Sequence, residues 1–328
     1  MKIAKASRVC IAAALLVPMT LAWAQGPAAY PTKPIRLIVG FPPGGGADAV
    51  ARIVAERMSR DLGQSIIIDN KPGAGTTIAA EAAARAEPDG YTVFIGSANL
   101  FGADKILYKT IRYDGQKDFT PISRWTIAPM VLAVNNDIGV KSVQELIAKA
   151  KQNPGKYFYA SSGSGGAPHM AGVYFNKLGG TRMEHVPFKG GAPAVTAVIA
   201  GDAQMIFATP PSVLPMVETG KLKALAVTSE KRSPLLPNLP TVSEGGVKGY
   251  DFTFWFGLFG PANLPPDVVR KLFTASQKAL SDPEVVRKLA AQGNEALPSA
   301  SPDEFRKWAL AEGAKSKQLI EQSGAHLD

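Results

Sequence analysis

The sequence predicts an α/β protein that is divided into two lobes. The chain has 328 residues, a length typical of two domains. Short apolar segments with the character of strands alternate with segments of helical period, and this alternation pauses near residue 96 and restarts near Trp125. In each half a glycine-rich turn follows an apolar segment. Open α/β sheets bind ligands at such turns, so a ligand cleft is expected between the lobes.

The first half is expected to form a parallel sheet with helices on both faces. The segment 47–62 has apolar residues at helical spacing and ends at Gly63, a favoured stop for a helix. Uninterrupted apolar strands joined by helices are typical of parallel sheets with two buried faces. The predicted strands are 35–41, 65–68 and 91–96, and the predicted helices are 47–62 and 76–86.

The second half repeats this pattern and then returns to the first lobe. A capping box from Ser142 to Glu145 begins one helix, and Asp282 and Ser301 are predicted N-caps, each followed by proline. The segment 252–259 is apolar on both alternating faces, which predicts a buried strand. The remaining predicted strands are 130–134, 157–161, 185–187, 205–208 and 223–228, and the helices are 142–153, 168–178, 192–200, 266–280, 283–291 and 302–323.

The buried strand at 252–259 is expected to carry the chain back to the first lobe. The first lobe then comprises residues 25–125 plus 250–328, and the second comprises 126–249. Two crossings between the lobes would act as a hinge, so the predicted architecture is a two-lobed clamp.

Residues 1–24 have the pattern of a secretory signal peptide. Three basic residues precede an apolar run, and Ala22-Trp23-Ala24 matches a cleavage site, so cleavage after Ala24 is expected. The run from Val9 to Leu21 is short for a membrane span, which needs about 20 residues. Cleavage would remove Cys10, the single cysteine, and leave 328 − 24 = 304 residues that need no oxidative folding.

The charge of the chain favours small anionic ligands over nucleic acid. The formal net charge is +9, and removal of three basic signal residues leaves about 9 − 3 = +6. The basic residues are scattered and form no stripe interleaved with aromatic residues, so nucleic-acid binding is not expected. A mild positive field would help to recruit anions.

The segment from Ile35 to Asp48 runs from an apolar strand through Pro-Pro-Gly-Gly-Gly into a helix. Glycine lets backbone N–H groups approach a ligand, and a helix N-terminus adds unpaired donors and a partial positive charge. This pattern predicts an anion site for phosphate or carboxylate.

A dinucleotide site is the first alternative for this turn. Gly44, Gly46 and Ala49 fit G-x-G-x-x-A, and Asp69 ends the next strand. Pro42 and neighbouring Pro43 lack the N–H groups that such a turn would offer. Export would also separate the protein from NAD and ATP, so no cofactor is expected.

A serine hydrolase is the second alternative. Residues 162–166 nearly spell the nucleophile motif G-x-S-x-G, and Ser164, Asp251 and His326 could be written as a triad. His326 lies two residues from the C-terminus, where a base is seldom held rigidly. The three histidines are separated and show no metal-ligand spacing, so neither catalysis nor a metal site is expected.

Six sequence blocks in a fixed order resemble the Bug-type receptors, the substrate-binding subunits of tripartite tricarboxylate transporters. The blocks are Tyr30–Gly46 with Asp48, Asp69–Gly75, Pro88–Thr92, Tyr159–Gly166 with His169, His185–Pro193 and Gly220–Ser229. The resemblance covers essentially the whole mature chain. It implies a type II periplasmic-binding-protein (Venus-flytrap) fold, no catalysis, and capture of a small carboxylic acid in the periplasm. The partner would be a tripartite permease or, alternatively, a membrane sensor kinase, and we expect a monomer.

In this resemblance the two glycine turns hold opposite sides of the ligand, and serine hydroxyls add to their N–H groups. Ser97 and Asn99 follow a first-lobe strand, and a further turn at 190–192 opens a helix. The predicted ligand-binding residues are Phe41, Gly44, Gly45, Gly46, Asp48, Ser97, Asn99, Ser162, Ser164, Gly165, Gly166, His169, Gly190 and Ala192.

Three of these residues have an alternative structural role. Asp48 would repel a bound anion and could instead accept hydrogen bonds from its own turn. His169 could be a packed histidine, and Phe41 could cap the core of its strand. The chain also departs from the family: Phe207–Ser212 lacks an aspartate that is usual there, which disfavours a cationic ligand group, and Phe188 replaces a commoner tyrosine.

Overall fold

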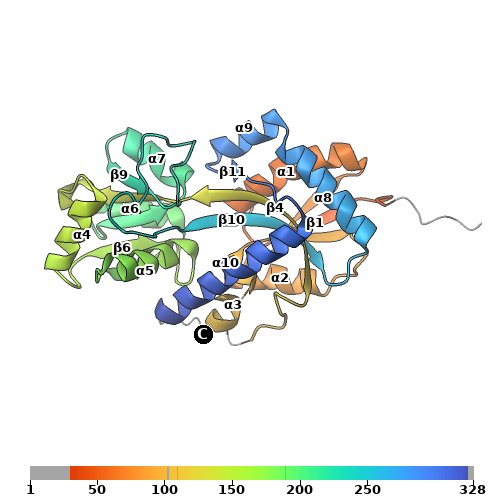
Figure 1. Ribbon diagram of the computed structural model, residues 1–328, viewed down its shortest axis with the longest axis horizontal. Coiled ribbons are helices and arrows are strands. Elements are labelled where there is room, and N and C mark those ends of the chain that lie inside the picture. The colour runs from red at the N-terminus through yellow and green to blue at the C-terminus, as the bar shows by residue number, and fades with distance from the viewer. Residues whose placement is uncertain (1–29, 102, 109, 189, 324–328) are drawn as a thin grey trace, which may run out of the picture.

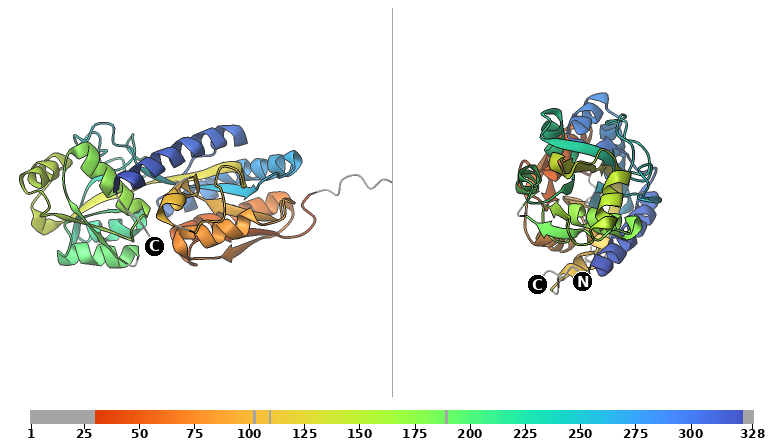
Figure 2. Two further views of the ribbon diagram at one scale, coloured as in Figure 1. Left: turned by 90° about the horizontal axis from the view of Figure 1, so that it is seen from below. Right: turned by 90° about the vertical axis from the view of Figure 1, so that its left-hand side faces the viewer.

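A computed structural model describes residues 30–101, 103–108, 110–188 and 190–323, so the predicted signal peptide, Cys10 and His326 lie outside it. Two β-sheets, each covered by helices, lie end to end along the long axis of the molecule (Figure 1). The left view in Figure 2 shows the same two bodies side by side. The prediction of a two-lobed α/β fold is confirmed.

The first sheet is mixed and has the strand order β11-β4-β10-β3-β1-β2. Strand β1 pairs in parallel with β2 and β3, whereas β10 runs antiparallel to β3 and β4. Buried residues of α1, α8 and α9 form a core on one face, and those of α2 and α10 form a core on the other. The bounds are β1 Ile35–Val39, β2 Ile66–Asn70, β3 Thr92–Gly96, β4 Phe119–Pro129, β10 Thr253–Pro261, β11 Glu295–Ala296, α1 Gly46–Leu62, α2 Thr77–Ala84, α3 Ala103–Leu107, α8 Pro266–Leu280, α9 Pro283–Ala291 and α10 Pro302–Ser323.

The second sheet is also mixed, with the order β7-β6-β8-β5-β9. Strand β6 is parallel to β7 and β8, and β5 is antiparallel to β8 and β9. Helices α4 and α5 pack on one face, and α6 and α7 on the other. The bounds are β5 Val131–Asn135, β6 Phe158–Ser161, β7 Glu184–Pro187, β8 Met205–Ala208, β9 Leu222–Val227, α4 Val143–Gln152, α5 Ala167–Gly179, α6 Gly191–Ala200 and α7 Pro210–Glu218.

The chain crosses between the sheets twice, and Thr228 joins the two crossings. Met130 separates β4 from β5, and Phe252 precedes β10. The buried Thr228 hydroxyl accepts from the Met130 N–H at 2.7 Å, and its carbonyl accepts from the Phe252 N–H at 2.8 Å. Helix α10 adds a third link, because Leu319 and Ile320 pack against Met170 of α5.

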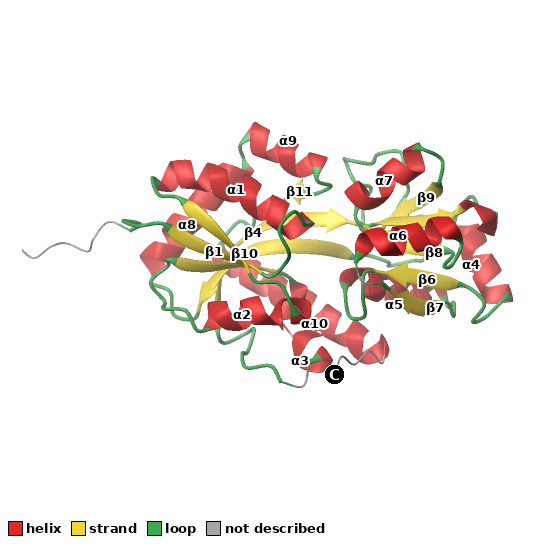
Figure 3. Ribbon diagram, turned by 180° about the vertical axis from the view of Figure 1, so that it is seen from behind, coloured by secondary structure: helices red, strands yellow, loops and turns green. Residues whose placement is uncertain are grey.

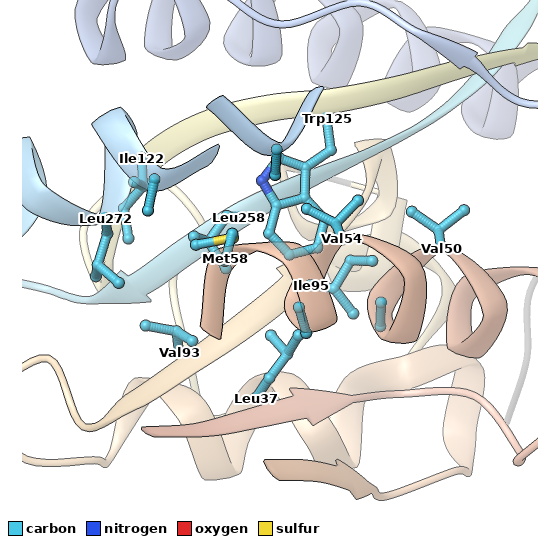
Figure 4. Close-up of a cluster of buried hydrophobic side chains, with 14 of the residues drawn as sticks. Leu37, Val50, Val54, Met58, Val93, Ile95, Ile122, Trp125, Leu258 and Leu272 are labelled. Carbon is cyan, nitrogen blue, oxygen red and sulfur yellow. The ribbon is translucent and has the colours of Figure 1, made fainter. Parts of the chain in front are cut away.

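The core of the first lobe holds helix α1 against the sheet. Trp125 of β4 is fully buried among Val54, Met58 and Leu258 (Figure 4), and its indole N–H donates to Ser276 of α8 at 3.1 Å. Burial of such large apolar side chains contributes about 1.5–3 kcal/mol each. This packing fixes the N-terminus of α1 at the edge of the sheet that faces the second lobe (Figure 3).

The expectation of a parallel sheet is wrong for the strands that carry the crossings. Strands β4 and β10 are antiparallel partners over nearly their full lengths, because the chain leaves the first lobe along one and returns along the other. Strand β4 was missed as an element because it contains Arg124 and other buried polar residues, which conceal its strand pattern. Helices α3 and α7 and the two-residue β11 were also not predicted, whereas the buried strand at 252–259 is confirmed as β10.

Candidate ligand-binding site

A cleft of about 710 Å³ lies between the two sheets and is lined by both. The crossing residues Ala128, Met130, Phe254 and Phe256 belong to its lining, so movement about the crossings would open or close it. The other lining residues are Phe41, Gly44, Gly46, Ala47, Gly75, Thr76, Ser97, Asn99, Tyr108, Ser162, Gly163, Ser164, Gly165, Gly166, Ala167, Pro168, Thr209, Pro211, Ser212, Gln292 and Asn294.

The first-lobe turn presents unpaired backbone donors to this cleft. Gly44 has φ +80°, a conformation that favours glycine, and Gly45 is the N-cap of α1 in an extended conformation. The Gly44 N–H donates to Asp48 Oδ2 at 2.9 Å. Within the described part of the chain, the N–H groups of Gly46 and Ala47 have no acceptor. They are therefore available to an anion.

Asp48 holds this turn in place and does not line the cleft. Its buried carboxylate accepts from Gly44, from Arg52 Nε at 2.8 Å and from Asn70 Nδ2 at 3.0 Å. Burial raises the pKa of Asp48, but the hydrogen bonds from Arg52, Gly44 and Asn70 outweigh burial and hold it below its ordinary value. With its lone pairs committed and its charge paired, Asp48 orders the turn while Arg52 offsets its repulsion of an anion.

The second-lobe turn repeats this geometry. Gly165 has φ +75°, Gly166 is the extended N-cap of α5, and the Gly165 N–H donates to Nδ1 of His169 at 3.0 Å. The N–H groups of Gly166 and Ala167 have no acceptor among the described residues. A second helix N-terminus with unpaired donors thus faces the same cleft.

His169 is buried behind the turn and stacks on His185 of β7, with ring centroids 3.7 Å apart and an interplanar angle of 11°. His185 Nε2 lies 2.6 Å from Ser161 Oγ, at the end of β6. Burial, with a smaller contribution from His185, lowers the pKa of His169 to about 3, and burial lowers that of His185 to about 4. Both rings are neutral at pH 7 and outside the cleft lining.

Several polar side chains of the lining have no partner within the described part of the chain. They are the hydroxyls of Ser97, Ser162 and Ser164 and the amides of Asn99 and Gln292. Ser97 is nearly fully buried, and buried polar groups are normally hydrogen-bonded. These side chains are therefore positioned to bind a polar ligand.

The apolar part of the lining is aromatic. Phe41 contacts Phe256 edge to face at 6.1 Å between ring centroids, and Phe256 contacts Phe254 at 4.8 Å. Phe41 also packs on the first-lobe core, so it both lines the cleft and caps the core of its strand. These rings form a wall along β10 against which the body of a ligand can lie.

The cleft brings together most of the predicted ligand-binding residues. Those in the lining are Phe41, Gly44, Gly46, Ser97, Asn99, Ser162, Ser164, Gly165 and Gly166, and those outside it are Gly45, Asp48, His169, Gly190 and Ala192. Gly45 is bonded through its N–H to the Pro42 carbonyl at 3.3 Å.

Sequence reasoning missed the contributions of α7, β10 and the α9–β11 turn. Thr209 and Ser212 lie in the segment that departs from the family pattern, so a signal for them was present. Gln292 and Asn294 gave no signal, because they join the site only through the short pairing of β11 with β4.

Neither alternative function gains support from the described residues. Asp251 accepts from the Glu230 N–H at 3.1 Å and lies 3.6 Å from Lys315, and it is not in the cleft lining. No group of three His, Cys, Asp or Glu side chains between residues 30 and 323, where described, could hold a metal ion. Over the same described stretch, none of the helices is both long and apolar enough to span a membrane.

The two lobes, the paired crossings and the cleft between them define a two-lobed binding protein of the periplasmic-binding-protein type. A family model described as the tripartite tricarboxylate transporter family receptor matches residues 50–325. The chain belongs to this family of Bug-type substrate-binding receptors.

Individual relatives agree with this assignment. Protein BugT of Bordetella pertussis is 33% identical over 300 residues, covering 91% of each chain. The structure of Rpa4515 of R. palustris with adipate has a TM-score of 0.80 and 34% identity, covering 91% of this chain and all of that one. MatC of Rhodopseudomonas palustris with bound malate has a TM-score of 0.75 and 30% identity, covering 89% of this chain and all of that one.

Proposed function

We propose that this protein is an extracytoplasmic receptor that captures a small carboxylate between its lobes. The observation that carries the proposal is the convergence of two helix N-termini, each with unpaired N–H groups, on one cleft. The bound adipate and malate of two relatives support a carboxylate as the ligand class.

The binding step follows from the geometry. A carboxylate accepts hydrogen bonds from the N–H groups of Gly46 and Ala47 in one lobe and of Ala167 in the other. The Ser164 hydroxyl adds a further donor. Hydrogen bonds to a charged group contribute about 1.5–3 kcal/mol each. After the costs of association, a few such bonds fit an affinity that is roughly micromolar, about −8 kcal/mol. Because the donors belong to both lobes, the ligand favours the closed clamp.

We assign the lobes close to the predicted bounds of 25–125 plus 250–328 and 126–249, but place the first crossing at Met130, because residues 126–129 of β4 pair with β10 in the first sheet. The hinge lies at the Thr228 contacts. Residues 1–24 direct export to the periplasm, where the monomeric receptor delivers its ligand to a tripartite permease. A sensor kinase is the alternative partner and shares the same binding step. No catalytic step is needed, and Ser164 serves as a donor rather than as a nucleophile.

Calorimetry of the protein without residues 1–24 tests the proposal. The protein is unfolded and refolded to remove any bound ligand, and then titrated with mono-, di- and tricarboxylates and with esters. We expect one carboxylate class to bind. Ser164→Ala should weaken this binding about tenfold, close to the 1.4 kcal/mol of one lost hydrogen bond.

The matched control is Ser65→Ala, which removes an exposed hydroxyl just before β2 and should leave the affinity unchanged. No binding across the panel would contradict the receptor function. Equal affinity of the wild type and Ser164→Ala would contradict the role of that hydroxyl alone.

A further inference from the structure

The cleft lining contains no charged side chain among the residues that the structure describes. The nearest acidic group of the first-lobe turn, Asp48, is paired with Arg52 and lies behind the lining. A ligand carboxylate is therefore held by neutral donors alone. A second charge elsewhere on the ligand would find no side chain of opposite charge in this lining.

One border of the cleft is built from the β8–α7 turn and the α9–β11 turn, which meet across the two lobes (Figure 3). Gly293 makes this approach possible, because a Cβ there would lie 2.8 Å from Pro211 and 3.1 Å from Pro210. Thr209 and Ser212 of one lobe and Gln292 of the other consequently share this border. Asn294 holds its turn by donating to the Gln292 carbonyl at 3.1 Å and accepting from Thr126 at 3.3 Å.

The hydrogen-bonding capacity of this border is specific. Ser212 Oγ lies 2.8 Å from the Thr209 carbonyl oxygen and 3.0 Å from Thr209 Oγ1. When Ser212 donates its single proton to the carbonyl, the Thr209 hydroxyl is the donor to Ser212 Oγ. Thr209 Oγ1 is left with lone pairs only and can accept a hydrogen bond from a ligand. The Gln292 amide, which is exposed and has no partner in the described chain, can both donate and accept.

A carboxylate can only accept and an ammonium can only donate, so neither satisfies both Thr209 and Gln292. Glu295, the residue after Asn294, accepts from Ser233 at 2.6 Å and lies outside the lining, so it supplies no charge to the cleft surface. An uncharged group with both a donor and an acceptor fits the border.

We propose that the receptor selects monocarboxylates whose far end is an uncharged group that both donates and accepts hydrogen bonds, as a primary amide or a hydroxyl does. The aromatic wall of Phe41, Phe256 and Phe254 contacts the apolar body between the two ends. This inference rests on the proposed carboxylate receptor function and adds the substrate class.

A series that changes only the far end tests the inference. The six-carbon probes are adipate, its monoamide adipamate, 6-aminohexanoate and hexanoate, and the ring-bearing probes are terephthalate, 4-carbamoylbenzoate, 4-(aminomethyl)benzoate and benzoate. Titrations are made at about 0.15 M salt, where long-range attraction between the basic protein and a dianion is screened. In the series that binds, we expect the amide to bind at least tenfold tighter than the diacid and the ammonium compound.

A change of charge at the border provides a gain of function. Gln292→Arg should reverse the preference, raising the affinity for the diacid above that for the amide. Gln152→Arg adds the same charge at the exposed end of α4, away from the cleft, and should change neither affinity.

The outcomes separate the two claims. A diacid or an ammonium compound that binds the wild type tightest overturns the selectivity while the receptor function stands. An amide that binds no tighter than hexanoate or benzoate overturns the role of the border. No binding by either series or by any acid of the wider panel overturns the receptor function, and the selectivity with it.

Discussion

The two glycine turns of the cleft have the same backbone geometry and are held by different chemistry. In each, a glycine with φ of +75° to +80° donates its N–H to a side chain four residues later, in the first turn of the following helix. The acceptor is the Asp48 carboxylate in one lobe and the His169 imidazole in the other. In both turns the N–H groups at the start of the following helix have no acceptor in the described chain and face the cleft.

The difference lies in how many groups hold each acceptor. Asp48 accepts three hydrogen bonds and reaches β2 through Asn70, so it ties the turn to two elements. His169 accepts a hydrogen bond from Gly165 and is held further by stacking on His185. The comparison shows that the same donor geometry can be built with a charged, multiply bonded acceptor or with a neutral, packed ring.

Asp48→Ala should cause the larger loss of stability. It removes the acceptor of Gly44, Arg52 and Asn70 at once, and we expect the free energy of unfolding to fall by about 2–3 kcal/mol. Urea denaturation measures this loss. Asp48→Asn keeps an oxygen acceptor and should lose less. A loss below about 1 kcal/mol for Asp48→Ala would show that the charged network adds little.

His169→Phe should cost less, because only one donor loses its acceptor. The phenyl ring preserves the stack on His185, whereas the buried Gly165 N–H is left without a partner, at a cost of about 1–2 kcal/mol. The same urea experiment measures this cost. A loss greater than that of Asp48→Ala would reverse the ranking of the two turns.

Removal of a single unpaired donor should affect binding alone. Gly46 occupies the first position of α1, where proline is tolerated because the N–H has no acceptor there. Gly46→Pro should therefore weaken carboxylate binding about tenfold in calorimetry, with no loss of unfolding free energy. Gly46→Ala is the matched control, since it keeps the N–H and places its Cβ in open space. Equal weakening by both would assign the effect to the side chain.

The same comparison shows what could be predicted from the sequence. The glycine turns, the helices that follow them and the two lobes were predictable, because turn chemistry and hydrophobic period are local properties. The sequence did not predict which N–H groups of the turns are already bonded. The N–H groups of Gly44 and Gly165 have side-chain acceptors whereas those of Gly46 and Ala167 have none, and this depends on the folded positions of Asp48 and His169.

Long-range contacts also explain why strand β4 and the border between the β8–α7 and α9–β11 turns were not predicted from the sequence. Arg124 is tolerated in the buried strand β4 because it donates to the Leu297 carbonyl at 2.8 Å and lies 4.5 Å from the centre of the Trp308 ring. Gln292 reaches the cleft because Gly293 lets two turns from different lobes touch. No local pattern in the sequence reports either contact.

A fall in pH should destabilise the second-lobe turn before the first-lobe turn. This is the smallest and most local of the expected effects. The pKa values of His169 and His185, about 3 and about 4, lie below the ordinary histidine value near 6.5. Between pH 6.5 and pH 4 the unfolded chain therefore binds more protons than the folded chain. Their contribution to stability is therefore lost as pH falls from about 6.5 towards 4. Asp48, whose pKa is lowered from an ordinary value of 3.8, keeps its contribution until the pH falls below that value.

Amide hydrogen exchange, corrected for the intrinsic rate at each pH, measures this difference turn by turn. Tyr159, Lys177 and Glu184 line a surface pocket together with the two histidines, and Lys177 and Glu184 carry opposite charges, so the expected change is modest. Between pH 7 and 5 we expect protection of Gly165 to decline while that of Gly44 holds. His185→Gln retains an acceptor for Ser161 without a proton-binding ring, and it should reduce the decline at Gly165. Parallel declines at both glycines would show that the two turns open together, and the chemical difference between their acceptors would then have no local consequence.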